Sequence, residues 1–312
     1  MDRGAYVVGR VLQMVPVLIV VSILVFLMIR LIPGDPAVTL LGVEATTEKV
    51  QALHQHLGLD QPLPVQFLIF ATGLAHGDLG TSFIVRVPVL QLVQERLPLT
   101  LFLVAYAMTL AVFITFPLAV LAALKKDSTF DQLIRGFTVA IMSTPGFWIG
   151  ILLLIVLGVK LGAFPVGGAG KTWGDRFYYL FLPALTLALG VSAVLIRNLR
   201  DAILNTLNAE HVVFARAKGL ARKLVLVKHV LRNALISTIT LFGLYIGFLV
   251  GGSVIIESVF ALPGMGSMMV SAILGRDYQV VQGFTLVYAV LVSVVYMLTD
   301  IAYSFVDPRI TL

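Results

Sequence analysis

The segment Gly168-Ala169-Gly170-Lys171-Thr172 looks like the end of a phosphate-binding P-loop. The complete motif requires a glycine five residues before its Gly-Lys-Thr end, and Pro165 occupies that position. The motif also requires a preceding strand, and no strand pattern precedes this segment. We therefore expect no nucleotide site in this chain, so any dependence on ATP must come from a partner protein.

Histidines could ligate a metal, and His54, His56 and His76 lie in one region. His54 and His56 are two residues apart, so on a helix they point to different sides. We interpret them as surface histidines and keep a metal site as the minor alternative. The chain has no cysteine, no Ser/His/Asp or HExxH set, and no mid-membrane carboxylate pair. These absences argue against a metal centre, an enzyme and a proton-driven pump.

The stretch from Arg197 to Arg232 carries eight Lys or Arg and only two acids. Within it, Glu210–Lys218 is predicted to form a short helix, because apolar and small residues recur there at helical spacing. Gly219 is a suitable stop, since glycine tolerates the left-handed conformation just past a helix end. The small residues Ala215 and Ala217 would let another surface approach closely. The pattern predicts a short helix that docks into a partner at the membrane face.

The composition places these residues in a membrane protein. The 312 residues are 59% hydrophobic and 12% charged, with a mean hydropathy of +1.01, whereas soluble domains carry about 25% charged residues. A helix needs ~20 apolar residues to cross a bilayer. Six stretches reach that length: Val11–Leu31, Leu97–Leu124, Gly136–Val159, Phe177–Ile196, Ala234–Ile256 and Val280–Thr299.

Charge distribution predicts the orientation of these spans. With both termini in the cytoplasm, Lys125–Asp131 and Asp201–Arg232 are cytoplasmic, and that side holds most of the Lys and Arg residues. The positive-inside rule favours this arrangement over its inverse. It also accounts for the net charge of +6 without nucleic acid. The first apolar stretch is too long for a signal peptide and lacks a cleavage site, so we interpret it as a retained anchor.

The external side is predicted to hold Pro33–Arg96 and the turn Ala261–Gly266. In the first region, Thr46 or Thr47 can cap a helix that Gly58 ends, and Pro64 can begin a second helix that stops near Gly77. Both would lie on the membrane surface. After the turn, Met268–Leu274 is apolar but too short to span, which indicates a re-entrant or surface helix.

The membrane spans themselves carry no distinctive chemistry. We expect any polar path between them to be lined by small and hydroxyl side chains, although such residues also serve ordinary helix packing. The candidates are Ser143, Thr144, Ser192, Gly251, Gly252 and Ser253. Charged residues within the spans are scarce, and Arg30, Glu257 and Asp300 fall near span ends, where they can reach the interface.

Two ordered strings carry a family resemblance: Phe214-Ala215-Arg216-Ala217-Lys218-Gly219-Leu220 and Lys228-His229-Val230-Leu231-Arg232-Asn233-Ala234-Leu235. Together they resemble the coupling loop of bacterial ABC importer permeases, most closely the dipeptide/oligopeptide/nickel branch. Two positions differ from that family, which usually has an aromatic residue at His211 and a proline at Ser237. Further matches lie at Leu31–Pro36, Leu57–Leu63, His76–Gly80 and in the loop around Arg276-Asp277-Tyr278.

The resemblance implies three groups of site residues. The ATPase-coupling group is Glu210, His211, Ala215, Arg216, Ala217, Lys218, Gly219 and Leu220. The external gate loop is Glu257, Pro263, Gly264, Gly266, Arg276 and Asp277. The residues expected to contact an external binding protein are Asp35, Asp60 and Asp78.

The resemblance also implies the fold: an all-α membrane protein of six transmembrane helices, with a cytoplasmic coupling helix and an external helical insertion between the first two spans. Residues 1–96 would form the anchor and the external region. Residues 97–312 would form the five-span transport core, with the coupling loop at about 198–233. The location would be the bacterial inner membrane, with both termini cytoplasmic.

The implied function is that of a permease subunit, forming half of the path for di- or oligopeptides. The expected partners are a second homologous permease, two cytoplasmic ATPases that hold ATP and Mg²⁺, an external binding protein and membrane lipid. This chain would hold no cofactor. The same machinery could instead import nickel, a metal–metallophore complex or glutathione. A self-sufficient secondary transporter is the rival class, but it usually has an inverted repeat, and none is visible here.

Overall fold

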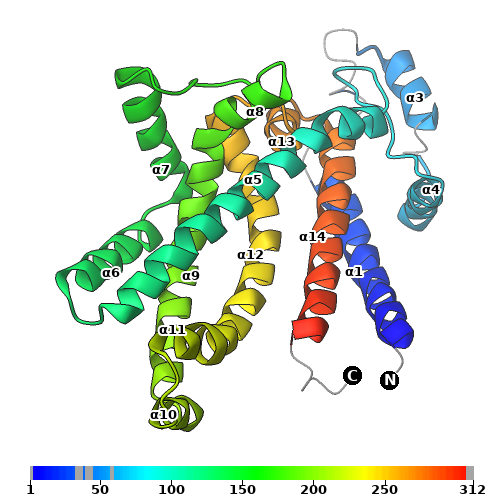
Figure 1. Ribbon diagram of the computed structural model, residues 1–312. Coiled ribbons are helices and arrows are strands. Elements are labelled where there is room, and N and C mark those ends of the chain that lie inside the picture. The colour runs from blue at the N-terminus through cyan, green and yellow to red at the C-terminus, as the bar shows by residue number, and fades with distance from the viewer. Residues whose placement is uncertain (1–2, 32–37, 39–44, 57–59, 307–312) are drawn as a thin grey trace. The chain divides into compact units, whose positions relative to one another are not determined.

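The computed structural model describes residues 3–31, 38, 45–56 and 60–306 (Figure 1). These residues form helices and no strand apart from one isolated bridge, so the predicted all-α class is confirmed. Two segments, η2 and η3, are π-helical. In chain order the elements are α1 (Arg3–Leu31), α3 (Thr47–His56), α4 (Leu63–Ala75), α5 (Val89–Leu124), α6 (Thr129–Met142), α7 (Gly146–Leu153), η2 (Leu154–Lys160), α8 (Trp173–Tyr179), α9 (Phe181–Leu207), α10 (Glu210–Ala217), α11 (Arg222–Leu224), η3 (Val225–Leu231), α12 (Arg232–Val259), α13 (Met265–Leu274) and α14 (Tyr278–Val306).

Within the described ranges, five helical runs are long and apolar enough to cross a bilayer. They are Val11–Met28, Val89–Leu124, Phe181–Leu207, Arg222–Val259 and Tyr278–Ile301. The sixth predicted span, Gly136–Val159, is not one straight helix. It is a pair, Thr129–Met142 and Gly146–Lys160, that meets at an angle of 107°.

The break in that pair has a local cause. Pro145 has no backbone N–H to continue the helix, and its ring excludes Thr144 from helical geometry. Pro145 itself has an extended backbone, with φ −57° and ψ 133°, and α7 begins at the next residue. The Thr144 hydroxyl donates to the Ala140 carbonyl oxygen at 2.8 Å, which satisfies one helix-end acceptor inside the apolar segment.

The chain divides into two compact units. The first unit combines Met1–Pro98 with Ser267–Leu291, and the second combines Leu99–Gly266 with Val292–Leu312.

The first unit contains the two short helices predicted for the insertion. Thr46 accepts a hydrogen bond from the Lys49 backbone N–H at 3.4 Å, as expected for a cap of α3. The helix α4 begins one residue before Pro64, and Gly77, with φ +78°, follows its end. Phe26 of α1 packs edge-on against Phe67 of α4, with ring centroids 5.2 Å apart. The predicted stop at Gly58 lies outside the described residues.

In the second unit, the helix α9 is the centre of the core. Its residues pack against α6, α7 and α12, and small or apolar side chains such as Ala184, Ala188 and Leu195 are buried along it. The predicted span ended at Ile196, but the helix continues to Leu207. The added turns place Leu199 and Ile203 in the core.

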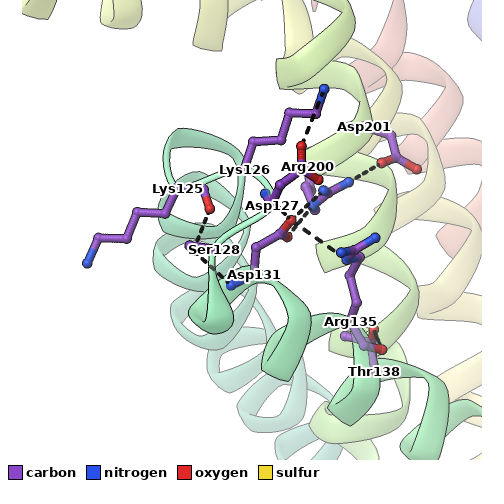
Figure 2. Close-up of polar contacts among 9 residues, drawn as sticks. All are labelled: Lys125, Lys126, Asp127, Ser128, Asp131, Arg135, Thr138, Arg200 and Asp201. Carbon is purple, nitrogen blue, oxygen red and sulfur yellow. Dashed lines mark hydrogen bonds and ion pairs between the residues drawn. The ribbon is translucent and has the colours of Figure 1, made fainter.

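These turns also bury a charge. Arg200 is held in a bidentate ion pair with Asp131 of α6, through Nε to Oδ1 at 2.6 Å and Nη2 to Oδ2 at 2.8 Å (Figure 2). Asp131 has no exposed surface. Its Oδ2 also accepts the backbone N–H of Asp127 at 3.0 Å, and Arg135 lies 3.7 Å away. The pair therefore fastens the start of α6 to α9.

We predict that removing one partner of this ion pair lowers the stability of the fold. Arg200→Ala leaves Asp131 buried without its guanidinium, which should destabilise the fold by about 3–5 kcal/mol. The double variant Asp131→Asn with Arg200→Met leaves no buried charge and should recover most of that loss. Thermal unfolding of the purified chain, followed by loss of the monodisperse species, measures the effect.

The exposed pair Lys126–Asp127, at 3.9 Å, provides the matched control. Lys126→Ala should cost at most about 1 kcal/mol, because exposed ion pairs are solvated and screened. Equal unfolding temperatures for Arg200→Ala and Lys126→Ala would contradict a fastening role for the buried pair.

Candidate functional site

The helix α10 forms where the sequence predicted it. Ala209 precedes it in an extended conformation, Glu210 lies in the first turn and Arg216 in the last, which suits the helix dipole. The helix ends at Ala217, and Lys218 caps it. Gly219 has φ +78°, the left-handed conformation expected just past a helix end.

One face of α10 is buried within this same chain. Val212 and Ala215 join a core cluster with residues of α5, α9, η3 and the start of α12, among them Ala123, Ile203 and Val230. Ala215 was expected to let a partner approach closely, but its side chain faces the core of this same chain. The residue is only 5% exposed, because the helix needs a buried face to be held in place.

The opposite face of α10 is open to solvent and partly apolar. Val213 and Phe214 are 54% and 62% exposed, and Arg216, Ala217 and Lys218 are also exposed. Lys218 Nζ lies 4.6 Å from the centre of the Phe214 ring, a cation–π contact that orders both side chains. An exposed aromatic ring beside a cation is typical of a docking surface.

The remaining coupling residues surround this face. Glu210 and Leu220 are exposed. His211 Nε2 lies 3.3 Å from the Asn233 side-chain amide, which joins α10 to the first turn of α12. The usual aromatic residue at position 211 is thus replaced by a side chain with a polar partner.

A continuous path of contacts leads from α10 toward the bend at Pro145. The cluster around Ala215 includes Leu199 and Ile203 of α9. The neighbouring Arg200 holds Asp131 at the start of α6 (Figure 2), and α6 ends at the 107° bend. Sequence reasoning missed Arg200. The spacing of Ile196, Leu199 and Ile203 could have revealed it, because it extends the buried face of α9 past the predicted span end.

The bend borders a cavity of about 400 Å³ in the second unit. Residues of α6, α7, α9 and α12 line it, including Thr144, Thr186, Gly190, Tyr245, Phe248 and Gly252. No residue in its lining is charged at neutral pH. The cavity is therefore mostly apolar, with a few hydroxyl groups.

This geometry separates the predicted pathway residues. Thr144 and Gly252 line the cavity. Ser192 and Ser253 instead are buried, and their hydroxyls donate to the backbone oxygens of Ala111, at 3.4 Å, and Val250, at 2.8 Å. For these two serines the packing alternative is correct.

The predicted gate loop has a buried carboxylate at its base. Glu257 was expected to reach the membrane interface, but it is completely buried. It accepts the Thr100 hydroxyl at 2.6 Å and the Gly266 backbone N–H at 2.7 Å. A Cβ on Gly264 would collide with the Glu257 carboxylate, and a Cβ on Gly266 with the Val254 backbone. Both glycines are therefore required by the packing, Gly264 in the turn after Pro263 and Gly266 in the first turn of α13.

Asp277, the other carboxylate of that loop, belongs to the first unit. It accepts the Ser82 hydroxyl at 2.5 Å and the backbone N–H groups of Phe83 and Ile84 at 3.3 Å. It thereby fastens the loop before α5 to the start of α14. Its neighbour Arg276 is exposed, with φ +57°.

Three residues were expected to contact a binding protein, and the structure describes two of them. Asp35 lies outside the described residues. Asp60 and Asp78 are exposed, and Asp78 accepts the backbone N–H of Gly80 at 2.8 Å.

The part of the chain that the structure describes shows no group of three or more His, Asp or Glu side chains arranged to hold a metal ion. The P-loop-like residues have a local role instead. Thr172 and Asp175 form a capping box at the start of α8.

Two family profiles match this chain: "Binding-protein-dependent transport system inner membrane component" over residues 115–312, and its N-terminal companion over residues 4–104. Relatives match along the whole length. A provisionally named peptide transport system permease of Brucella suis is 40% identical, covering 98% of each chain. The oligopeptide permease AppB of Bacillus subtilis is 39% identical, covering 98% of this chain and 99% of AppB. The glutathione permease GsiC of Pectobacterium atrosepticum is 38% identical, covering 98% of each chain.

The fold is similar to a solved structure, the inward-facing MetNI methionine ABC transporter in its CY5 native crystal form. The TM-score is 0.59 at 17% identity, covering 70% of this chain and 97% of that chain. Together with the family matches, these similarities establish that the chain belongs to the inner-membrane components of binding-protein-dependent ABC transport systems.

Proposed function

We propose that this chain is a permease subunit that forms half of the pathway of an ATP-driven importer for di- or oligopeptides. The full-length similarity to AppB, an oligopeptide permease, supports the substrate class. The partners would be a second permease, two cytoplasmic ATPases and an external binding protein. ATP and Mg²⁺ would bind to the ATPases, and this chain would have no catalytic role.

Glutathione is the second candidate, because GsiC is nearly as similar. Glutathione is itself a tripeptide, so the same kind of pathway would fit both. The uncharged lining of the cavity supports a route that discriminates little between peptide side chains, with selection left to the binding protein.

The observation that carries the coupling role is that α10 is buried on one face and exposed on the other. One face is held in the core with α9, and the other presents Phe214 beside Lys218. A force applied by an ATPase to Phe214 would reach α9 through Val212 and Ala215. The ion pair between Arg200 and Asp131 would pass it to α6, and so to the bend at the cavity.

The substrate assignment predicts peptide uptake that requires every component. Proteoliposomes with the assembled complex and its binding protein should accumulate a labelled dipeptide when ATP reaches the ATPases. Excess unlabelled peptide should compete, and Ni²⁺ should not. Accumulation of glutathione without peptide would shift the assignment to the second candidate. Peptide uptake by this chain without ATPases would favour the secondary transporter.

The docking surface predicts a selective effect at Phe214. Phe214→Ala should weaken ATPase association by about 2 kcal/mol, the scale of an interface hot spot, which is more than tenfold in affinity. Substrate-stimulated ATP hydrolysis and uptake should fall together. The measurements are ATPase co-purification and transport by the reconstituted complex.

Phe113 of α5 is the matched control, since its ring is also largely exposed. Phe113→Ala removes the same ring and should leave ATPase association unchanged. Equal losses in both variants would show that ring removal damages the subunit as a whole, which would contradict docking through Phe214.

The orientation can be tested by labelling, because this chain contains no cysteine. An impermeant thiol reagent applied to intact cells should label Asp60→Cys and should not label Lys223→Cys. The reason is the excess of Lys and Arg near position 223, which favours the cytoplasmic side. Labelling of position 223 from outside would reverse the proposed topology.

A further inference from the structure

The short helix α8 exposes several aromatic rings. Trp173 is 68% exposed, and Phe177 and Tyr178 are about half exposed. These rings do not move freely. Phe177 packs edge-on against Phe102 of α5, at 5.1 Å between ring centroids. The Tyr178 hydroxyl donates to the Ala163 carbonyl oxygen at 2.9 Å.

The depth of α8 follows from its neighbours in the second unit. It lies between two apolar segments, one ending at Lys160 and the other beginning at Phe181. Phe102 lies less than two turns after Arg96, the last charged residue before the uncharged part of α5. Contact with Phe102 therefore puts α8 alongside the end of a span, at the level where Trp and Tyr gather in membrane proteins.

Two cations of this segment have no carboxylate partner among the described residues. The Arg176 guanidinium lies 4.7 Å from the centre of the Trp173 ring, and Lys171 is exposed. The nearby Asp175 forms no ion pair with either of them, because its carboxylate faces the backbone. Its carboxylate accepts the backbone N–H groups of Thr172, at 3.0 Å, and Lys171, at 3.3 Å. These bonds, first of all the one from Thr172, hold the pKa of Asp175 below its usual range.

We propose that α8 is a lipid-binding element: its aromatic rings lie in the headgroup layer, and Arg176 and Lys171 bind the phosphate of an anionic phospholipid. Rigid amphipathic rings that are apolar at one end suit this layer. A guanidinium stacked on an indole presents its edge to a phosphate oxygen. The proposal concerns the lipid contact alone and does not depend on the transported substrate.

A probe can be placed on α8 without disturbing these groups. Gly174 is exposed, and a Cβ added there would meet nothing closer than the Thr172 hydroxyl oxygen at 3.9 Å. The Gly174→Cys chain, assembled with cysteine-free partner subunits and labelled with bimane, is reconstituted in nanodiscs. The quenchers are phosphatidylglycerol and phosphatidylcholine carrying a doxyl group near the headgroup end of one acyl chain.

Labelled phosphatidylglycerol should quench more strongly than labelled phosphatidylcholine at equal mole fraction. Each cation at an anionic membrane surface contributes a factor of about five in affinity, so removing both should reduce the preference by about twenty-fivefold. Lys171→Gln with Arg176→Gln is the test variant. Arg86→Gln with Arg276→Gln removes two exposed cations elsewhere and should leave the preference intact.

Three outcomes would overturn the proposal. Quenching by aqueous iodide with none by either lipid would place α8 in water. If the two lipids quenched equally, and the test variant gave the same result, a contact between these cations and the lipid phosphate would be excluded. Protection of the bimane from the lipid quenchers by the added binding protein would identify α8 as a protein-docking surface instead.

Discussion

The bidentate ion pair between Asp131 and Arg200 is the interaction on which the second unit depends most. A buried carboxylate is tolerable only with a well-oriented partner, and a guanidinium fork provides that geometry. The pair fixes the start of α6 against α9 at the level where α10 enters the same core. It thereby joins α6 to α9, and α9 also shares its core cluster with α10.

The other end of α6 lies at a sharp bend in the chain. Pro145 removes a backbone donor and turns the apolar segment by 107°, so α6 and α7 can meet at the cavity from different directions. Within a membrane, an interrupted helix is tolerated where protein or a water-filled cavity surrounds it. The Thr144 hydroxyl donates to the Ala140 carbonyl oxygen and so satisfies one acceptor at the end of α6.

Buried carboxylates are also used where loops meet helix ends. Glu257 holds the start of α13 at Gly266, and Asp277 holds the loop that precedes α5. Each accepts hydrogen bonds from backbone N–H groups and from one hydroxyl. Such acceptors stabilise irregular backbone that has no helical partner of its own. In these two loops, the role of the acidic side chains is to hold the backbone in position.

The sequence alone determined the features that depend on local chemistry. The helical class, the membrane spans and the end of α10 at Gly219 follow from apolar length, spacing and glycine conformation. The break at Pro145 had a local signal as well, but its angle did not, because packing against α9 sets the direction of α7. Only the tertiary structure decided which face of α10 is free. Ala215 and Phe214 both fit a docking helix by residue type, and burial by α9 removes the first and leaves the second exposed. Arg200 was missed and Glu257 was misplaced for the same reason: a charge near a span end reaches water unless a distant segment, here Asp131 or Thr100, supplies its partner.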